Sequence, residues 1–535
     1  MSEQQGDRRT FTSRTPDNDN PERVAYRRGF VTRHQVSGWR FIQRRIASGV
    51  ALHDTRMLVD PLRTQSRSVL VGALLLITAL AGCFIFSLIR PAGDAGDSAI
   101  LADRDTAALY VRLGEQVHPV LNLTSARLIA NRADNPTMVK SSEIDQFPRG
   151  NLIGIPGAPE RMVQNTASDA DWTVCDAASG SAAGVTVIAG PLEGGTRGQE
   201  RSDSGEGRSE RASALPDQDA VLVRNDGGPN AGTWLLWQGR RSQIDLNDRA
   251  VTGALGLNAD LPAPRTISPG LFNAVPEAPA LRVPAIPGAG SQPGFPVPAP
   301  VGGVVAAFDA DNTLRHYAVL TDGLQPISPV VAAILRNSHS HGLDQPPRLG
   351  ADEVSRLPVS RAIDVDAYPS EPVTLVDAAA SPLTCAHWDH PVDATSGTLE
   401  LLAGAALPVQ DGLRAIQLVG AGTGTTANRV VAAPGTGFLV QTVGQDVRQQ
   451  PASPAAGSVF WISDTGVRYG IDQDAAGQDG TDALSALGLT PPALPIPWAM
   501  LSQFAEGPTL SRADALLAHD GLAPDPSPAV VRETP

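Results

Sequence analysis

The sequence predicts an α+β protein with one transmembrane helix and a β-rich core, flanked by four small αβ repeat units that arise from a tandem duplication. Three observations predict this class. One long stretch lacks charged residues, two consecutive segments of the remainder resemble each other, and both contain short runs of alternating apolar and polar residues. Because 42% of the 535 residues are hydrophobic and 18% are charged, most of the chain can bury a core.

The first element that can be assigned firmly is the transmembrane helix, at residues 68–90. The stretch from Ser68 to Ile89 contains no charged residue. At about 1.5 Å per residue it would extend about 33 Å as a helix, which is enough to cross about 30 Å of hydrocarbon. A secretory signal is the alternative, but a long arm precedes the stretch and no small-residue cleavage site closes it. Small residues such as Gly72 and Ala79 would allow close helix contacts between subunits.

Charge is distributed unevenly on the two sides of this helix. The arm of residues 1–67 holds thirteen arginines and seven acidic residues, so the remainder carries about −20 while the whole chain carries −14. Cytoplasmic flanks are enriched in arginine, so we expect the arm in the cytoplasm and the region from Pro91 onward outside the plasma membrane. The acidic outer region excludes an extended basic surface for nucleic acid.

The arm contains a predicted helix from His34 to Arg56, after a polar segment that ends at about Glu22. Trp39, Ile42, Ile46 and Val50 recur at helical spacing and form one apolar stripe, with arginines largely outside it. A basic amphipathic helix can lie on anionic headgroups or dock on a partner protein. We predict partner docking through Trp39, Phe41, Ile42 and Ile46, because Trp39 and Phe41 are larger anchors than a helix on a lipid surface requires. The alternative is that the helix only lies on lipid.

The outer region divides into two similar halves, 91–290 and 301–520, which are joined by a Pro/Gly linker at 291–300 and followed by a flexible tail at 521–535. Each half opens with a strand-like run that ends in proline and continues into a helix. These are VRLGEQVHPV with LNLTSARLIA, and HYAVLTDGLQPI with SPVVAAILRN. Each half then has a cysteine beside a predicted hairpin, followed by a pair of tryptophan-containing strands.

Each half closes with a second αβ unit of shared design. The common order is Ile-Asp, a short helix that ends in Ala-Leu-Gly-Leu, a proline-rich turn, and a second helix. Gly256 and Gly488 stand where the first helix would end, a position that favours a residue with positive φ. The segment Thr196 to Ser213 has no counterpart and is predicted to be a disordered surface insertion.

A disulfide between Cys175 and Cys385 follows from the duplication. Both cysteines precede equivalent hairpins, and Cys83, the third cysteine of the chain, lies in the predicted span. Matching halves around a pseudo-twofold axis would bring equivalent elements together in one core. The outer compartment is oxidising, so we expect the two thiols to be joined there.

The sequence offers weak candidates for chemistry. The glycine-rich stretch Gly420 to Arg429 could supply Gly422, Gly424, Thr425 and Arg429 to a nucleotide, but it lacks a lysine, and its flanks predict strand and turn. Lys140, the single lysine of the chain, has no glycine around it. His387 and His390 beside Cys385, and the pair His339 and His341, are weak metal candidates. We predict no catalytic residues, no cofactor and no resident metal.

The arm and span resemble those of the EccB family, a membrane component of the type VII (ESX) secretion systems of mycobacteria and related actinobacteria. The resemblance is carried by Thr32, Gln35, Trp39-Arg40-Phe41, Arg44-Arg45, Asp54, Arg56-Met57 and Asp60-Pro61-Leu62-Arg63. The outer repeats and the two cysteines are also similar, so the resemblance covers nearly the whole chain. Within the family, the chain is most similar to the branch tied to metal acquisition.

This resemblance implies a structural and assembly subunit of the inner-membrane secretion complex, present as a homo-oligomer. The implied partners are EccC, EccD and EccE, with the mycosin protease on the outer side, and the exported cargo is WXG100-type and PE/PPE proteins. Family members also bear an ATPase label, which would imply ATP as a ligand. Two alternatives follow: an ATPase outside the cytoplasm, and a receptor for cell wall or cargo.

Overall fold

The computed structural model describes the larger part of the 535 residues. The described ranges are 32–54, 61–89, 95–179, 183–193, 211–257, 261–309, 312–392, 394–420, 426–444, 457–472 and 482–522. Several predicted features therefore lie outside the described residues: the polar N-terminal segment, most of the insertion at 196–213, Gly422, Gly424 and Thr425, and the tail beyond 522. The chain divides into two compact units, Met1–Ala92 and Gly93–Pro535, which are described separately.

The first unit consists of two helices, α1 (Arg33–Leu52) and α2 (Pro61–Ile89). Helix α1 begins with a capping box, in which Thr32 and Gln35 each accept a hydrogen bond from the backbone N–H of the other. It ends at Leu52, four residues before the predicted end at Arg56, and the following residue, His53, has a left-handed conformation. Within the described residues, Arg67–Phe86 of α2 is the segment long and apolar enough to cross a membrane, and all of it is exposed.

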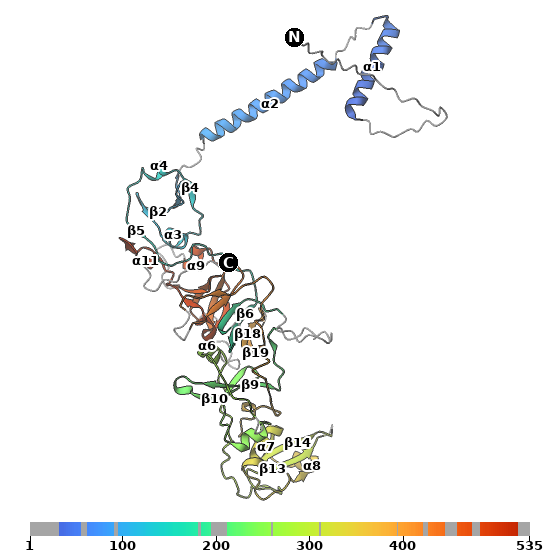
Figure 1. Ribbon diagram of the computed structural model, residues 1–535, viewed down its shortest axis with the longest axis vertical. Helices are drawn as coiled ribbons and strands as arrows, with labels where there is room; N and C mark the ends of the chain where they lie inside the picture. The colour runs from blue at the N-terminus through green and yellow to red at the C-terminus, as the bar shows by residue number, and fades with distance from the viewer. Residues whose placement is uncertain are drawn as a thin grey trace, which may run out of the picture. The chain divides into compact units, whose positions relative to one another are not determined.

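The second unit contains two four-stranded sheets with the same strand order. One is β3-β2-β1-β4 and the other is β15-β14-β13-β16 (Figure 1). In each, the three antiparallel strands lead into a helix, and the fourth strand then returns parallel to the first. The elements of the first sheet are β1 (Ile100–Asp103), β2 (Leu109–Leu113), β3 (Gln116–Pro119), α3 (Leu123–Ala130), β4 (Thr137–Val139) and α4 (Ser141–Ile144). Those of the second are β13 (Val304–Phe308), β14 (Leu314–Val319), β15 (Leu324–Ile327), α7 (Pro329–Ser338), β16 (Arg348–Leu349) and α8 (Ala351–Arg356).

Two five-stranded sheets form a second matching pair. In each, three antiparallel strands are followed by a short helix and by a strand parallel to the first of the three. The first sheet has β9 (Asp219–Asn225), η1 (Gly228–Asn230), β10 (Gly232–Trp237), β11 (Arg240–Gln243), α5 (Arg249–Ala254), β12 (Arg265–Thr266), α6 (Pro269–Ala274) and β17 (Thr374–Leu375). The second has β22 (Phe438–Val443), β23 (Val459–Ile462), β24 (Val467–Ile471), α9 (Ala483–Leu487), β25 (Leu494–Pro497), α10 (Trp498–Leu501) and β26 (Ala505–Glu506). Gly256 and Gly488 have φ of 78° and 76°, which confirms the predicted helix ends.

A seven-stranded sheet joins the two halves, in the order β20-β21-β7-β6-β18-β19-β8. Its strands are β6 (Ala170–Ala177), β7 (Gly184–Ala189), β8 (Ser213–Ala214), β18 (Leu383–His390), β19 (Thr398–Gly404), β20 (Ile416–Gln417) and β21 (Arg429–Val431). At its centre β6 and β18 run antiparallel, so that Trp172 faces Trp388 and Cys175 faces Cys385. Strands of both halves therefore alternate in one sheet, as predicted for the core.

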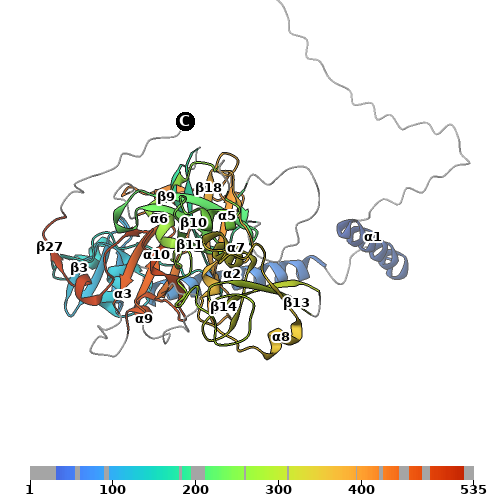
Figure 2. The ribbon, with the colours of Figure 1, turned by 90° about the horizontal axis from the view of Figure 1, so that it is seen from below.

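The halves also contact each other through their small αβ units. Helix α3 packs against α9 and against α11 (Arg512–Ala515), while α5 packs against α7 (Figure 2). Strand β5 (Leu152–Ile153) pairs with β27 (Ala518–His519), and β17 joins the sheet of β9. Each small αβ unit of one half thus contacts an αβ unit of the other half.

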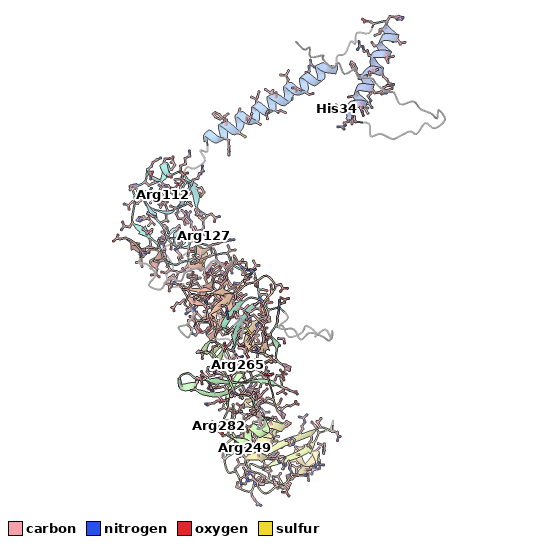
Figure 3. All side chains as sticks on the ribbon, in the orientation of Figure 1. His34, Arg112, Arg127, Arg249, Arg265 and Arg282 are labelled. Carbon is pink, nitrogen blue, oxygen red and sulfur yellow. A yellow bond between two sulfur atoms is a disulfide. The ribbon has the colours of Figure 1, made fainter. Side chains whose placement is uncertain are left out.

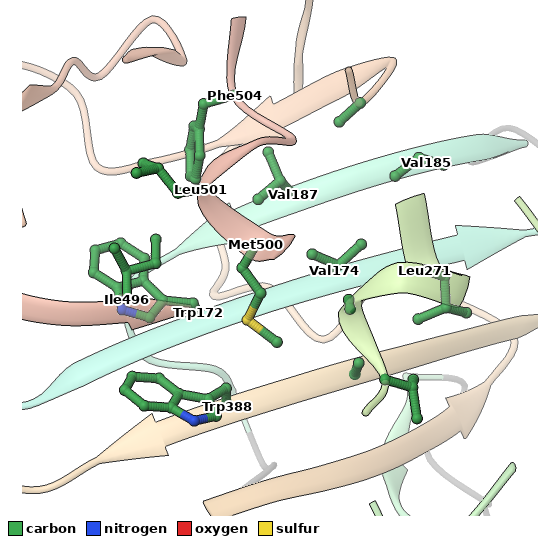
Figure 4. Packing of buried hydrophobic residues seen from close by; sticks show 14 of the residues in the cluster. Trp172, Val174, Val185, Val187, Leu271, Trp388, Ile496, Met500, Leu501 and Phe504 are labelled. Atoms are coloured by element: carbon green, nitrogen blue, oxygen red, sulfur yellow. The ribbon is translucent and has the colours of Figure 1, made fainter. Parts of the chain in front are cut away.

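The largest buried cluster lies on one face of the seven-stranded sheet. Figure 4 shows Met500 of α10 with Trp172 of β6 to its left, Trp388 of β18 beneath it and Leu271 of α6 to its right. The two helices come from different halves, and these side chains are at most 4% exposed. A shared core of this kind explains why residues 93–535 form one compact unit.

The Pro/Gly stretch at 291–300, which was predicted to be a linker, forms a closed loop. The Gly290 N–H donates to the Val301 carbonyl at 2.8 Å, and the Val301 N–H donates to the Ser291 carbonyl at 2.9 Å, which closes a loop. Phe295 and Val297 pack against a buried cluster that contains Val305. The stretch is folded because it carries apolar side chains among its prolines, a signal that composition alone does not give.

Candidate functional site

Helix α1 offers an apolar surface that none of the described residues of its own unit covers. Trp39, Ile46 and Val50 are 62%, 61% and 75% exposed. This exposure is unfavourable, because the free energy falls when an apolar side chain is removed from water. At 100° per residue these side chains and Ile42 lie within about 80° of one another around the helix. We call this set, Trp39, Ile42, Ile46 and Val50, the Trp39 stripe.

Phe41 does not belong to the Trp39 stripe. It follows Trp39 by two residues and therefore lies about 200° away, on the opposite side of α1. Its side chain is 41% exposed and shares its side with Leu52, which is 57% exposed. The predicted docking set of Trp39, Phe41, Ile42 and Ile46 therefore spans two sides of α1, with Phe41 apart from the other three.

In the second unit, Gly93–Pro535, which we call the outer unit, the predicted disulfide between Cys175 and Cys385 is present at the centre of the seven-stranded sheet. The two Cα atoms are 4.0 Å apart in directly opposed strands, and both side chains are fully buried. The covalent bond thus joins β6 of the first half to β18 of the second. Cys385 is consequently not a metal ligand.

Beside the disulfide, the same face of the sheet carries a buried polar pair. The Nδ1 atom of His387 lies 2.9 Å from the Thr173 hydroxyl, while its buried Nε2 lies 3.9 Å from a carboxylate oxygen of Asp171. Burial lowers the pKa of His387, although the nearby Asp389 acts in the opposite direction. Burial also raises the pKa of Asp171, with further contributions from Asp389 and Asp169.

The metal candidates are not brought together. His387 and His390 are three residues apart on β18, and alternate residues of a strand face opposite sides of a sheet. His387 accordingly lies beside Thr173, whereas the ring of His390 lies 5.7 Å from that of Trp388. The rings of His339 and His341 are 4.2 Å apart, without a third ligand. Within the described residues no group of three or more His, Cys, Asp or Glu could hold a metal ion.

The described part of the nucleotide candidate has a structural role. Arg429 begins β21, where its guanidinium donates to the Ala183 carbonyl at 2.7 Å and to the Thr186 hydroxyl at 3.4 Å. Strands β20 and β21 pair antiparallel, so the glycine-rich stretch connects two strands, as its flanks predicted. Lys140 is exposed at the start of the four-residue helix α4. A phosphate-binding loop instead leads from a strand into a long helix.

The structure also shows a buried ion pair that sequence reasoning missed. Arg265 of β12, which is labelled in Figure 3, lies 3.5 Å from the Asp176 carboxylate. The two side chains are 6% and 8% exposed. The guanidinium also donates to the carbonyls of Pro382 and Asp176, while the Ser268 N–H donates to the carboxylate. Neither residue stands in a local motif, and their separation along the chain hides the contact from pattern analysis.

A groove of about 890 Å³ opens beside β8 and β19, between the β10–β11 turn and the 3-10 turn η2 (Val365–Ala367). Its lining includes the carboxylates of Asp217, Glu277, Asp364, Asp366 and Glu400, together with Arg240. The hypothesis of a cargo or cell-wall receptor would require such a groove. This lining would attract a basic ligand rather than an acidic one.

Comparisons of the sequence with a family model and with known proteins point to the same family. The family model described as "Type VII secretion system ESX-1, transport TM domain B" matches residues 28–524. The protein named ESX-3 secretion system ATPase EccB3 of Mycolicibacterium smegmatis is 65% identical over 98% of this chain and 97% of its own length. The protein named ESX-5 secretion system ATPase EccB5 of Mycobacterium marinum is 35% identical over 94% of this chain and 96% of its own.

Solved structures agree with these relatives. The EccB3 dimer from the ESX-3 core complex superposes with a TM-score of 0.67 at 59% identity, covering 79% of this chain and all of that chain. A chain of the periplasmic assembly from the ESX-5 inner membrane complex superposes with a TM-score of 0.67 at 35% identity, covering 83% of this chain and all of that chain. The chain is therefore similar to these proteins in the fold of its outer unit as well as in its sequence.

Proposed function

The chain belongs to the EccB family of the ESX type VII secretion systems, and from this premise we propose that it serves the ESX-3 branch, the metal-acquisition system. EccB is a component of the ESX inner-membrane complex, where its role is structural and in assembly. The assignment to a branch is supported by identity, which is 65% to an EccB3 and 35% to an EccB5 over nearly the whole chain.

Within that complex, the chain forms a dimer and contacts EccC, EccD and EccE on the membrane side and the mycosin protease on the outer side. The dimer is supported by the likeness to the EccB3 dimer of the ESX-3 core complex, at 59% identity over 79% of the chain. The contacts with the named subunits are proposed from membership in the family. The exported cargo, WXG100-type and PE/PPE proteins, follows from the same membership.

The N-terminal arm lies in the cytoplasm and the outer unit in the periplasmic space. Two features support this orientation. The arm is rich in arginine while the outer region is acidic, in agreement with the preference of cytoplasmic flanks for basic residues. The outer unit also contains a disulfide, which persists in oxidising compartments.

A tandem duplication produced the outer unit. Besides the matching strand orders, one arginine in each half makes the same kind of contact, with a backbone carbonyl and a nearby glutamate near the end of that half. Arg241 of β11 donates to the carbonyl of Val275 and contacts Glu277 at 3.2 Å. Arg468 of β24 donates to the Phe504 carbonyl at 3.2 Å and lies 3.7 Å from Glu506.

Partner docking by α1 uses the Trp39 stripe. Its four apolar side chains form one strip, with glycines at one edge and Gln43 and Ala47 at the other. Small residues at the edges of an apolar strip allow another helix to approach closely. The occupant that fits this surface is therefore an apolar helix of a partner subunit.

The relatives are named ATPases, so nucleotide hydrolysis is the second function to be tested. The described residues do not favour it, because Arg429 holds strand β21 in place and Lys140 stands at an exposed helix start. If hydrolysis occurs in this chain, it does not use a phosphate-binding loop with lysine.

Deletion of the encoding gene in its own host, followed by complementation, tests the structural role. The wild-type chain should restore the complex and the export of WXG100-type cargo. A chain with Lys140→Ala should restore both equally well. Restoration of the complex without restoration of export by this variant would instead support a catalytic role. Unchanged export in the deletion strain would contradict the proposed function.

A further inference from the structure

Helix α1 has a second apolar face, formed by Phe41 and Leu52. We propose that this face lies on an anionic bilayer surface, with Phe41 and Leu52 in the apolar layer and the adjacent arginines at the headgroups, while the Trp39 stripe is held by a protein partner. The proposal extends the docking role proposed above, and it assigns to Phe41 a contact different from that of Trp39.

The geometry of α1 separates the two faces. Leu52 follows Phe41 by eleven residues and therefore lies about 20° from it around the helix. By the same periodicity Arg44 and Arg45 lie about 60° to one side and about 40° to the other. Phe41 and Leu52 thus form a narrow apolar face with an arginine at each edge.

The Trp39 stripe has different edges. Gly38, Gly49, Gln43 and Ala47 border it, and the nearest arginines, Arg45 and Arg40, lie about 60° and about 80° beyond its two edges. A surface with neutral edges suits a packed helix, whereas apolar residues flanked by arginine suit the boundary between headgroups and acyl chains. The two faces therefore require two different kinds of environment.

Charge complementarity favours lipid for the Phe41 face. Helix α1 contains Arg33, Arg40, Arg44 and Arg45 and no acidic residue. Arginine beside a membrane is attracted to anionic phospholipids, which supply both the negative headgroup and an apolar layer for Phe41 and Leu52. A soluble anion would satisfy the arginines alone and would leave the two exposed apolar side chains in water.

The length of the chain keeps α1 near the bilayer. Helix α1 ends at Leu52 and α2 begins at Pro61. The segment between them reaches at most about 30 Å when fully extended, at about 3.3–3.6 Å per residue. Because α2 contains the apolar span, α1 remains within that distance of the point where α2 starts.

Nitroxide accessibility in the assembled complex tests the proposal. The complex is reconstituted into nanodiscs of phosphatidylglycerol and phosphatidylcholine, with the full chain carrying Cys83→Ser and one added cysteine. Phe41→Cys and Leu52→Cys report on the second face, and Ile46→Cys and Val50→Cys report on the Trp39 stripe. Collision rates of each nitroxide are measured with oxygen, which partitions into lipid, and with a water-soluble nickel complex.

We expect nitroxides at 41 and 52 to collide more often with oxygen than with nickel, and those at 46 and 50 to be shielded from both. Arg44→Gln with Arg45→Gln should increase nickel access at position 41 several-fold, whereas Arg33→Gln, farther along the helix, should leave it unchanged. Nanodiscs of phosphatidylcholine alone should act like the double variant.

Nickel access at 41 and 52 equal to that of a water-exposed site, or shielding from both reagents, would overturn the lipid assignment. Oxygen access at 46 and 50 would instead contradict partner docking by the Trp39 stripe. The two pairs of positions thus separate a failure of this proposal from a failure of the docking role.

Discussion

Buried polar side chains fix the junction between the two halves of the outer unit. Asp176 follows Cys175 on β6, and Arg265 reaches both Asp176 and the carbonyl of Pro382, which precedes β18. Burial lowers the pKa of Arg265, while the carboxylate of Asp176 counteracts this shift. An ion pair of this kind is costly to break, because the remaining charge stays buried without its partner.

Replacement of Arg265 by methionine should destabilise the outer unit by about 3–5 kcal/mol, because Asp176 would be left buried and uncompensated. Arg224→Met is the matched control, since Arg224 lies on the neighbouring strand β9 in an ion pair with Asp226 that is more than half exposed. The control should cost less than about 1 kcal/mol. Denaturant unfolding of residues 93–535 measures both, and equal losses would contradict the account.

Removal of the disulfide should also destabilise the outer unit. Cys175→Ala with Cys385→Ala releases a loop of 210 residues, which corresponds to about 5 kcal/mol in the chain-entropy model. Non-reducing peptide mapping of the wild type should show the linked pair, and unfolding with and without reductant measures its contribution. Cys83→Ser in the full chain is the control, and free thiols at 175 and 385 in the wild type would refute the symmetric core.

His387 should make stability depend on pH. Its pKa in the folded protein lies below the ordinary value of about 6.5, so below that pH the unfolded chain binds a proton that the folded chain does not. Stability should therefore fall as the pH drops below about 6.5, by up to about 1.4 kcal/mol per unit until the folded-state pKa is passed. Unfolding of wild type and His387→Gln at several pH values measures this difference.

Asp171 provides the internal control for that experiment. Its raised pKa means that the folded state takes up a proton more readily than the unfolded state, so its contribution to stability grows as the pH falls. Asp171→Asn should therefore steepen the acid loss that His387→Gln reduces. Slopes that change in the same direction in the two variants would contradict the assignment of either pKa shift.

At the scale of elements, sequence patterns predicted local structure well where the pattern was complete. The cysteine hairpins, the tryptophan strands and the glycine-ended helices are all present, because alternation, helical spacing and turn residues act over a few positions. Helix α1 was predicted to end later than it does, since His53 adopts a left-handed conformation that its residue type does not signal. Phe41 was grouped with Trp39 by chemistry, although helical spacing places it on the other face.

The Trp39 stripe gives a prediction for the assembled complex. Trp39→Ala with Ile42→Ala removes the largest side chains of the stripe, so the complex should lose its partner subunits in mild detergent while the chain stays in the membrane. Phe41→Ala is the control, and it should leave the complex intact. Blue native electrophoresis measures both, and an intact complex in the double variant would favour the alternative in which α1 lies only on lipid.

At the scale of the whole molecule, pairing between distant segments determines the arrangement of the outer unit. The order of elements predicted a shared core, but it could not show that β17 joins β9 or that β27 joins β5. Strands β17 and β27 have two residues each, which is too short for a pattern. The ion pair of Arg265 escaped prediction because its two residues lie far apart in the sequence, whereas the folding of the 291–300 loop depends on local contacts that its composition does not reveal.

The central claim is that this chain is a structural subunit of an ESX inner-membrane complex, and the mass of the native assembly tests it most directly. The tagged full chain is purified from its own membranes in mild detergent and analysed by native mass spectrometry with identification of each subunit. The account predicts one large complex that contains at least two copies of the chain together with other ESX membrane components. A chain that is recovered as a monomer, free of ESX components under conditions that preserve the rest of the complex, would contradict it.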